Sequence, residues 1–139
     1  MEKPPVHPPV HPPVLVVDDN LALRTILSAI LTQEGYRVKS AAHGGQALDL
    51  MRASPTHMVV TLDMKMPEVD GLAVLEAVAA DPVGLQRHVI ILMTADVALA
   101  TSRHVIALRE RLGIPLLAKP YTANQVVDAI MVAERRLLG

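Results

Sequence analysis

Two adjacent aspartates, Asp18 and Asp19, follow a purely aliphatic run in the stretch VLVVDDN. The run Val14–Val17 is typical of a buried strand, and the two carboxylates stand where that strand should end. Neighbouring negative charges repel each other, and burial makes each of them costlier to keep ionised. The pair therefore predicts that a positive charge lies close by in the folded protein.

Three further residues that can do chemistry come at the ends of other apolar runs. Asp63 lies in TLDMKMPEVDG, Thr94 in VIILMTAD and Lys119 in IPLLAKPY. Taken singly, each has an ordinary explanation, because an aspartate often caps the next helix, a lysine is usually solvated and a threonine at a strand end is usually structural. All five residues, however, stand at the ends of core segments, four separate segments in total, and this shared placement favours one common site.

The combination of three carboxylates, a hydroxyl and an ammonium group suits phosphoryl chemistry. Close carboxylates need a cation, and a few carboxylate oxygens completed by water suit Mg²⁺. We therefore expect Asp18, Asp19 and Asp63 to form a magnesium site. A carboxylate is also a nucleophile towards phosphorus and forms an aspartyl phosphate. Lys119 would contact one phosphoryl oxygen as a point charge, and Thr94 would donate a hydrogen bond to another.

Short apolar segments alternate with helical patterns along the chain. We expect strands at Val14–Val17, Tyr36–Ala42, His57–Leu62, Val89–Met93 and Ile114–Ala118. The spacing of apolar residues predicts helices at Leu21–Gln33, Gln46–Ala53, Leu72–Ala80, Ala98–Leu112 and from Thr122, as the cap, to about Leu138. Asn20 is a candidate cap of the first helix.

Five strand–helix repeats predict an α/β fold, a doubly wound five-stranded parallel sheet of the flavodoxin-like (βα)5 type. In such sheets ligands bind beyond the carboxyl ends of the strands, at the point where the strand order reverses. The five chemistry-bearing residues all fall at that edge, so the fold and the site support each other.

Together, the segments LVVDDN, TLDMKMPEVDG, MTAD and AKPY resemble the signatures of the receiver domain of two-component response regulators, over roughly Val14 to Leu138. The resemblance implies that Asp63 accepts a phosphoryl group from a histidine kinase or a phosphotransfer protein. It also implies that Mg²⁺ is bound by Asp18, Asp19, Asp63 and the backbone carbonyl of Lys65, with Asp18 acting directly or through water.

The other motif residues also have counterparts in the family. Thr94 resembles the switch hydroxyl that moves towards the phosphoryl group, and Lys119 resembles the family's invariant lysine. A cis bond is expected between Lys119 and Pro120. Pro67 and Gly71 resemble the turn after the phosphate acceptor, where glycine would permit a positive φ.

The resemblance further implies an output surface made of the helix from Ala98, the fifth strand and the last helix. This surface is expected to bind a downstream protein, and a homodimer is the alternative use of it. Receivers often carry an aromatic residue three positions before the lysine, where this chain has Leu116, so the usual aromatic part of the switch is missing. At helical spacing an inward stripe is expected at Thr101, Val105, Leu108 and Leu112, with Leu99 and Ile106 as candidates for an apolar contact patch.

Lys65 and Asp96 are expected on opposite lips of the site, because they lie two residues after Asp63 and Thr94 respectively. A contact between them would cross the opening. There the lysine would screen a phosphoryl group or obstruct an attacking water molecule.

Composition limits the other possibilities. The chain has 139 residues, of which 51% are hydrophobic and 19% charged, and we expect one domain, residues 14–139, after a Pro-rich flexible tail, residues 1–13. A formal net charge of −1 argues against a nucleic-acid binder with a broad basic field. Without cysteine there is no thiolate chemistry. No signal peptide or membrane-length apolar run occurs, so we expect a cytoplasmic, single-domain regulator without membrane insertion.

The competing function is that of an enzyme, a Mg²⁺-dependent phosphatase of the haloacid dehalogenase type with an aspartate nucleophile. Enzymes of that class carry a second acidic residue two positions after the nucleophile, where this chain has Lys65. We therefore expect a phosphoacceptor that catalyses its own phosphorylation and dephosphorylation, and not a turnover enzyme.

Overall fold

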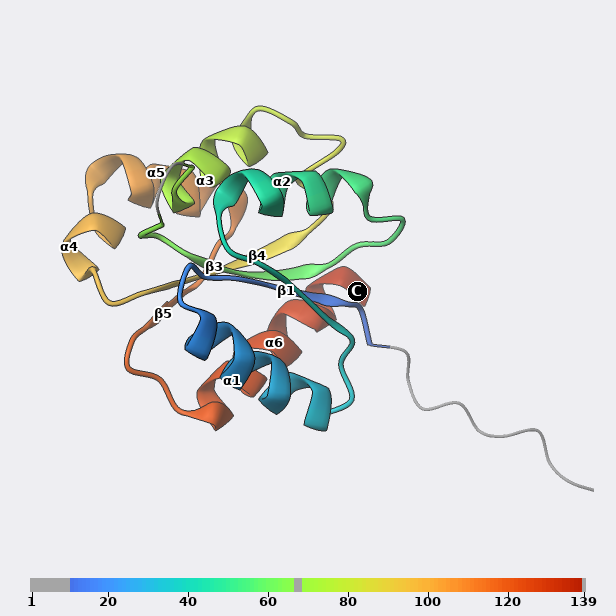
Figure 1. Ribbon diagram of the computed structural model, residues 1–139. Helices are drawn as coiled ribbons and strands as arrows, with labels where there is room; N and C mark the ends of the chain where they lie inside the picture. Colours follow the sequence, from blue (N-terminus) through green and yellow to red (C-terminus); the bar gives the residue numbers. More distant parts are fainter. Residues whose placement is uncertain (1–10, 67–68, 139) are drawn as a thin grey trace, which may run out of the picture.

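The fold is built from alternating strands and helices (Figure 1). A computed structural model describes residues 11–66 and 69–138 of the chain. The strands are β1 (Val14–Val17), β2 (Val38–Ala41), β3 (Val59–Asp63), β4 (Val89–Thr94) and β5 (Leu116–Ala118). The helices are α1 (Leu21–Gln33), α2 (Gly44–Ala53), α3 (Gly71–Ala79), α4 (Val97–Ala100), α5 (Arg103–Leu112) and α6 (Ala123–Leu138).

The strands form one parallel sheet in the order β2-β1-β3-β4-β5, which confirms the predicted fold class. The order reverses between β1 and β3, which lie side by side although β2 separates them in sequence. In their register Val17 lies beside Leu62, so the residues that follow, Asp18 and Asp63, leave the sheet at the same edge. The sheet therefore brings the predicted site residues to its reversal point.

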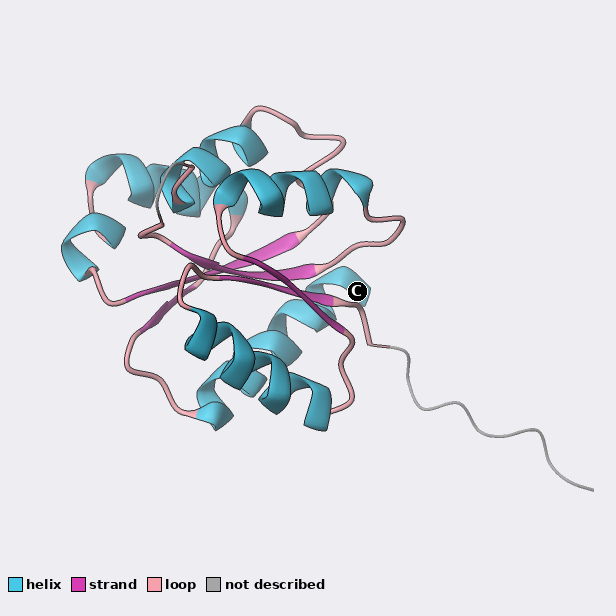
Figure 2. Cartoon of the chain, viewed as in Figure 1, coloured by secondary structure: helices cyan, strands magenta, loops and turns pink. Residues whose placement is uncertain are grey.

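Helices cover both faces of the sheet (Figure 2). The cluster that joins the sheet to α1 and α6 includes Val14, Val16 and Leu31, whereas the cluster under α2, α3 and α5 includes Leu15 and Val17. Successive residues of β1 thus point into opposite cores, as the period of a strand requires. This double burial explains why the strands appear as continuous aliphatic runs.

The predicted helix over 98–112 was wrong, because the structure has two helices there, α4 and α5. Ser102 adopts an extended conformation (φ −62°, ψ 150°), and its side chain accepts a hydrogen bond from the Val105 N–H, which caps α5. Thr101 is exposed at the break and does not belong to the inward stripe, in which Val105 and Leu108 are buried. Leu99 packs against the core and is only partly buried, so its role as a contact residue stays a prediction.

The last part of the predicted tail contacts the domain. The His11 ring lies 4.3 Å from the Tyr36 ring, and its Nδ1 pairs with Glu134 on α6. Tyr36 donates a hydrogen bond of 2.8 Å from its hydroxyl to the other carboxylate oxygen of Glu134. This cluster fixes residues 11–13 against α6 at the end of the sheet opposite the acidic edge. Residues 1–10 lie outside the described part of the chain, and the boundary between tail and domain stays a prediction.

The two tyrosines offer a matched test of this cluster. We expect Tyr36→Phe to lower the free energy of unfolding by about 1–3 kcal/mol, because it leaves a buried carboxylate oxygen of Glu134 without its donor. The control is Tyr121→Phe, because the buried hydroxyl of Tyr121 has no hydrogen-bond partner among the described residues. Its loss should be neutral or slightly stabilising. Urea unfolding followed by circular dichroism measures both variants, and equal losses in the two would contradict the assignment.

Candidate functional site

Asp18 is held in place by several backbone and side-chain contacts at the end of β1. The Asn20 N–H donates to Asp18 Oδ1 at 2.9 Å, and Arg24 Nη1 donates to the Asp18 backbone carbonyl at 2.7 Å. Asn20 also caps α1, as predicted, because its side chain accepts a hydrogen bond from the Leu23 N–H. The start of α1 thus fixes the direction in which the two aspartates leave the strand. Arg24 was not predicted, since a single arginine on a helix gives no signal by itself.

Asp63 is the last residue of β3, and the chain turns closely behind it. The Gly71 N–H donates to the Met64 carbonyl at 3.0 Å, and a Cβ at Gly71 would lie 2.6 Å from the Asp63 carbonyl oxygen. The predicted reason for this glycine was wrong, because the positive-φ glycines of the described residues are Gly35 and Gly113. Gly71 is needed because the backbones pass too closely for any side chain. Pro67, the other predicted turn residue, lies outside the described residues.

Lys119 and Thr94 complete the site from β5 and β4. Lys119 Nζ donates to Asp18 Oδ2 at 3.0 Å and lies 3.6 Å from Asp63 Oδ1. Its backbone N–H donates to the Thr94 carbonyl at 2.9 Å, which ties the ends of the two strands together. The Lys119–Pro120 bond is cis, as predicted. Thr94 is buried, and its hydroxyl oxygen accepts a hydrogen bond from the Asp96 N–H at 3.0 Å.

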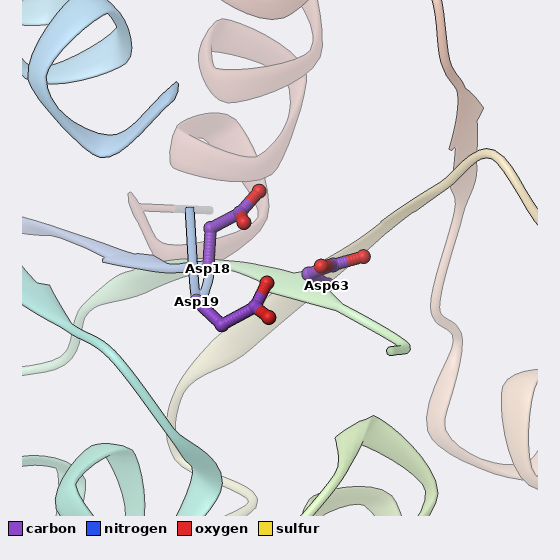
Figure 3. A group of neighbouring side chains, drawn as sticks. All are labelled: Asp18, Asp19 and Asp63. Atoms are coloured by element: carbon purple, nitrogen blue, oxygen red, sulfur yellow. The ribbon is translucent and has the colours of Figure 1, made fainter. Parts of the chain in front are cut away.

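The three carboxylates are neighbours at this edge of the sheet (Figure 3). One oxygen from each of Asp18, Asp19 and Asp63 lies within 4.8 Å of the others. They line a cleft of about 520 Å³ that Thr94 and Lys119 also line. The structure therefore brings all five predicted side chains together, although they come from four different strand ends.

Burial and neighbouring charge set the protonation of the site. Burial raises the pKa of Asp63 above its ordinary value; the Lys119 ammonium opposes this change, and the Asp18 carboxylate adds to it. Burial favours the neutral form of Lys119, but the hydrogen bond to Asp18 and the charges of Asp63 and Asp18 outweigh it, so the pKa of Lys119 is raised. One ammonium thus only partly offsets the crowded carboxylates.

The donor set fits a hard divalent cation. All the converging ligand atoms are carboxylate oxygens, the type that Mg²⁺ prefers. Both oxygens of Asp18 already accept a hydrogen bond, from the Asn20 N–H and from Lys119 Nζ. Asp19, which is exposed, and Asp63 are therefore the better placed direct ligands. An indirect role of Asp18, through water, agrees with this arrangement, and the role of the Lys65 carbonyl stays a prediction.

The predicted contact across the opening is confirmed. Lys65 Nζ lies 3.2 Å from Asp96 Oδ2, and the Lys65 side chain is 73% exposed. The pKa of Asp96 is lowered, first by the hydrogen bond from the Leu99 N–H and then by Lys65. Both residues line the cleft, so the pair lies at its rim.

The raised pKa of Asp63 has a consequence for stability. A carboxyl whose pKa is higher in the folded than in the unfolded protein destabilises the fold as the pH rises through the folded value. At neutral pH without Mg²⁺, Asp63→Asn should therefore raise Tm by a few degrees, since about 1 kcal/mol corresponds to roughly 2–8 °C in domains near this size. Calorimetry measures the change, with Asp49→Asn, at an exposed position of α2, as the control.

The same variant also tests the cation. Mg²⁺ should raise Tm of the wild type more than that of Asp63→Asn, because a ligand of the folded state stabilises it according to its affinity. A lower Tm for Asp63→Asn in the absence of Mg²⁺, or an equal response to Mg²⁺ in both proteins, would contradict this account.

Known proteins are similar to this chain in both sequence and fold. The response regulator receiver domain family matches residues 14–131. A probable chemotaxis protein CheY from Rhizobium etli is 35% identical over 119 residues, which are 84% of this chain and 88% of that protein. Sporulation initiation phosphotransferase F from Bacillus subtilis is 32% identical over 118 residues, 84% of this chain and 89% of that protein.

Solved structures of receiver domains are similar to this chain in fold. A CheY-like receiver domain protein from Methanospirillum hungatei has a TM-score of 0.76 at 27% identity, covering 89% of this chain and 94% of that one. Chemotaxis protein CheY4 of Vibrio cholerae has a TM-score of 0.73 at 25% identity, covering 88% and 98%. The matched family region starts at β1 and contains the whole acidic cleft. The chain belongs to the response regulator receiver domain family.

Proposed function

We propose that Asp63 is the residue that accepts the phosphoryl group, and that Asp18, Asp19, Asp63 and the Lys65 carbonyl hold the Mg²⁺ ion. The family match supports a phosphoacceptor role in signalling and argues against the phosphatase alternative. The observation that carries the assignment is the position of Asp63, in the cleft with a lysine ammonium 3.6 Å from its carboxylate.

The transfer is a displacement at phosphorus. A carboxylate oxygen of Asp63 attacks the phosphorus of a phosphohistidine, the P–N bond breaks, and the imidazole nitrogen leaves with the electron pair and takes a proton. Bound Mg²⁺ supplies charge neutralisation to the phosphoryl oxygens. Lys119 stabilises the charge of another oxygen, and the Thr94 hydroxyl donates to a third. In dephosphorylation a water oxygen attacks phosphorus, inorganic phosphate leaves and the Asp63 carboxylate is restored.

A histidine kinase or a phosphotransfer protein is the proposed donor. Leu23 of α1 lines the cleft, and two other apolar residues of this helix, Leu21 and Ile26, are 67% and 54% exposed. Leu23 thus offers an apolar contact at the cleft of Asp63, and Leu21 and Ile26 are exposed on the same helix, so that a partner helix carrying the phosphohistidine would rest on α1.

The output surface is proposed on α5, β5 and α6, where it would bind a downstream protein or a second copy of the chain. A groove of about 520 Å³ runs there between the two helices, and Ile106, Val132 and Arg136 are among its lining residues. Among the described residues, no helix has the length and apolar character to cross a membrane. A cytoplasmic location is part of the proposal, because it is where such a donor would meet this domain.

Acetyl phosphate with Mg²⁺ tests the acceptor. The wild type should become labelled with an acyl phosphate that hydroxylamine removes, whereas Asp63→Asn and wild type with a chelator should stay unlabelled. Asp49→Asn is the control and should be labelled like the wild type. Labelling of Asp63→Asn would contradict the assignment, and rapid multiple turnover of small phosphate esters would instead support the phosphatase.

The Lys65–Asp96 pair is expected to slow the attack of water on the phosphorylated residue. Lys65→Ala and Asp96→Ala should both shorten the lifetime of the acyl phosphate, roughly fivefold for each ~1 kcal/mol by which the barrier falls. The decay of labelled protein, freed of donor, gives the rate. Wild-type rates in both variants would reject a gating role.

A further inference from the structure

Tyr121 carries a buried hydroxyl that has no hydrogen-bond partner among the described residues. Buried polar groups in folded proteins are almost always paired, so such a group points to strain or to a partner in another state. Burial raises the pKa of Tyr121; Lys119 opposes this change, while Asp18 and Asp63 add to it. The hydroxyl therefore keeps its proton and is available as a donor.

The Tyr121 ring borders a second cavity beside the acidic cleft. This space of about 320 Å³ is mainly apolar and is lined by Leu23, Ala95, Lys119, Pro120 and Tyr121. Leu23, Ala95 and Lys119 also line the cleft that contains Asp63. Tyr121 thus packs partly against the core and borders open space next to the site of the proposed phosphorylation, which leaves room for movement on that side.

A short route through an ion pair and covalent bonds joins Asp63 to this ring. Lys119 contacts Asp18 and Asp63 through its side chain and the Thr94 carbonyl through its backbone N–H, and Tyr121 lies two residues further along the chain. A phosphoryl group on Asp63 would add up to two negative charges beside Lys119. The added charge would alter the contacts of the lysine side chain and of the end of β4.

We propose that Tyr121 is the conformational switch of this domain: phosphorylation of Asp63 moves the ring so that its hydroxyl donates a hydrogen bond that it lacks in the unphosphorylated protein. The proposal rests on the proposed function of Asp63. It places the aromatic switch two residues after Lys119, in a chain that has Leu116 on β5 and no phenylalanine or tryptophan. The unphosphorylated state would be weakened by the unpaired hydroxyl, and the phosphorylated state would gain the bond.

The aromatic composition gives a direct readout. With Tyr36 and Tyr121 as the two tyrosines and no tryptophan, the near-ultraviolet absorption difference between wild type and Tyr121→Phe reports Tyr121 alone. Mg²⁺ with beryllofluoride, which takes the place of a phosphoryl group on a carboxylate, should shift this difference spectrum to longer wavelength as the hydroxyl becomes a donor. The Tyr121→Phe spectrum, which reports Tyr36, should not change.

A second measurement is the affinity for beryllofluoride, followed by ¹⁹F NMR. A hydrogen bond made only in the bound state should make Tyr121→Phe bind roughly tenfold more weakly than wild type. The Asp63→Asn variant is the control for specific binding. The switch alone would be overturned if wild type binds beryllofluoride but the Tyr121 spectrum does not change and Tyr121→Phe binds with the same affinity. Failure of wild type to bind would overturn the proposed function and the switch with it.

Discussion

The convergence of negative charge at the end of β1 and β3 is the constraint on which the rest of this structure depends. Two unit charges about 5 Å apart repel by roughly 3 kcal/mol at an effective dielectric constant of about 20. The fold accepts this cost between Asp18 and Asp63, which are both buried, and places Lys119 Nζ between them. A single ammonium group leaves the cluster short of positive charge. The electrostatics alone therefore favour a cation at this cluster, before any likeness to known proteins is considered.

Several otherwise unrelated features serve this convergence. The parallel register of β1 and β3 brings the aspartates to one edge, and the close passage at Gly71 lets the chain turn away directly behind Asp63. The start of α1 orients Asp18 through Asn20 and Arg24. The cluster of His11, Tyr36 and Glu134, by contrast, lies at the opposite end of the sheet and stabilises the domain independently of the site.

The strand ends and the site could be predicted because each is indicated by a short stretch of sequence, and the separate stretches point to the same edge of the sheet. The apolar runs of β1, β3, β4 and β5 each end in, or directly before, a residue whose type is chemically useful, and parallel strands align such ends whatever the loops between them do. The break between α4 and α5 was missed because the apolar spacing continues across it, and only the capping of α5 by Ser102 reveals it. The reason for Gly71 was missed because a close approach of two backbones depends on tertiary structure. The contact of His11 with Glu134 joins residues at the two ends of the chain, and no local pattern encodes it.

A divalent cation bound by the acidic cluster is the central claim. A crystal structure determined from crystals grown with Mg²⁺ tests it most directly. The account predicts an ion about 2.0–2.1 Å from oxygens of Asp19 and Asp63, with Lys119 still bound to Asp18. A cleft without an ion at saturating Mg²⁺, with the three carboxylates turned away from one another, would contradict it.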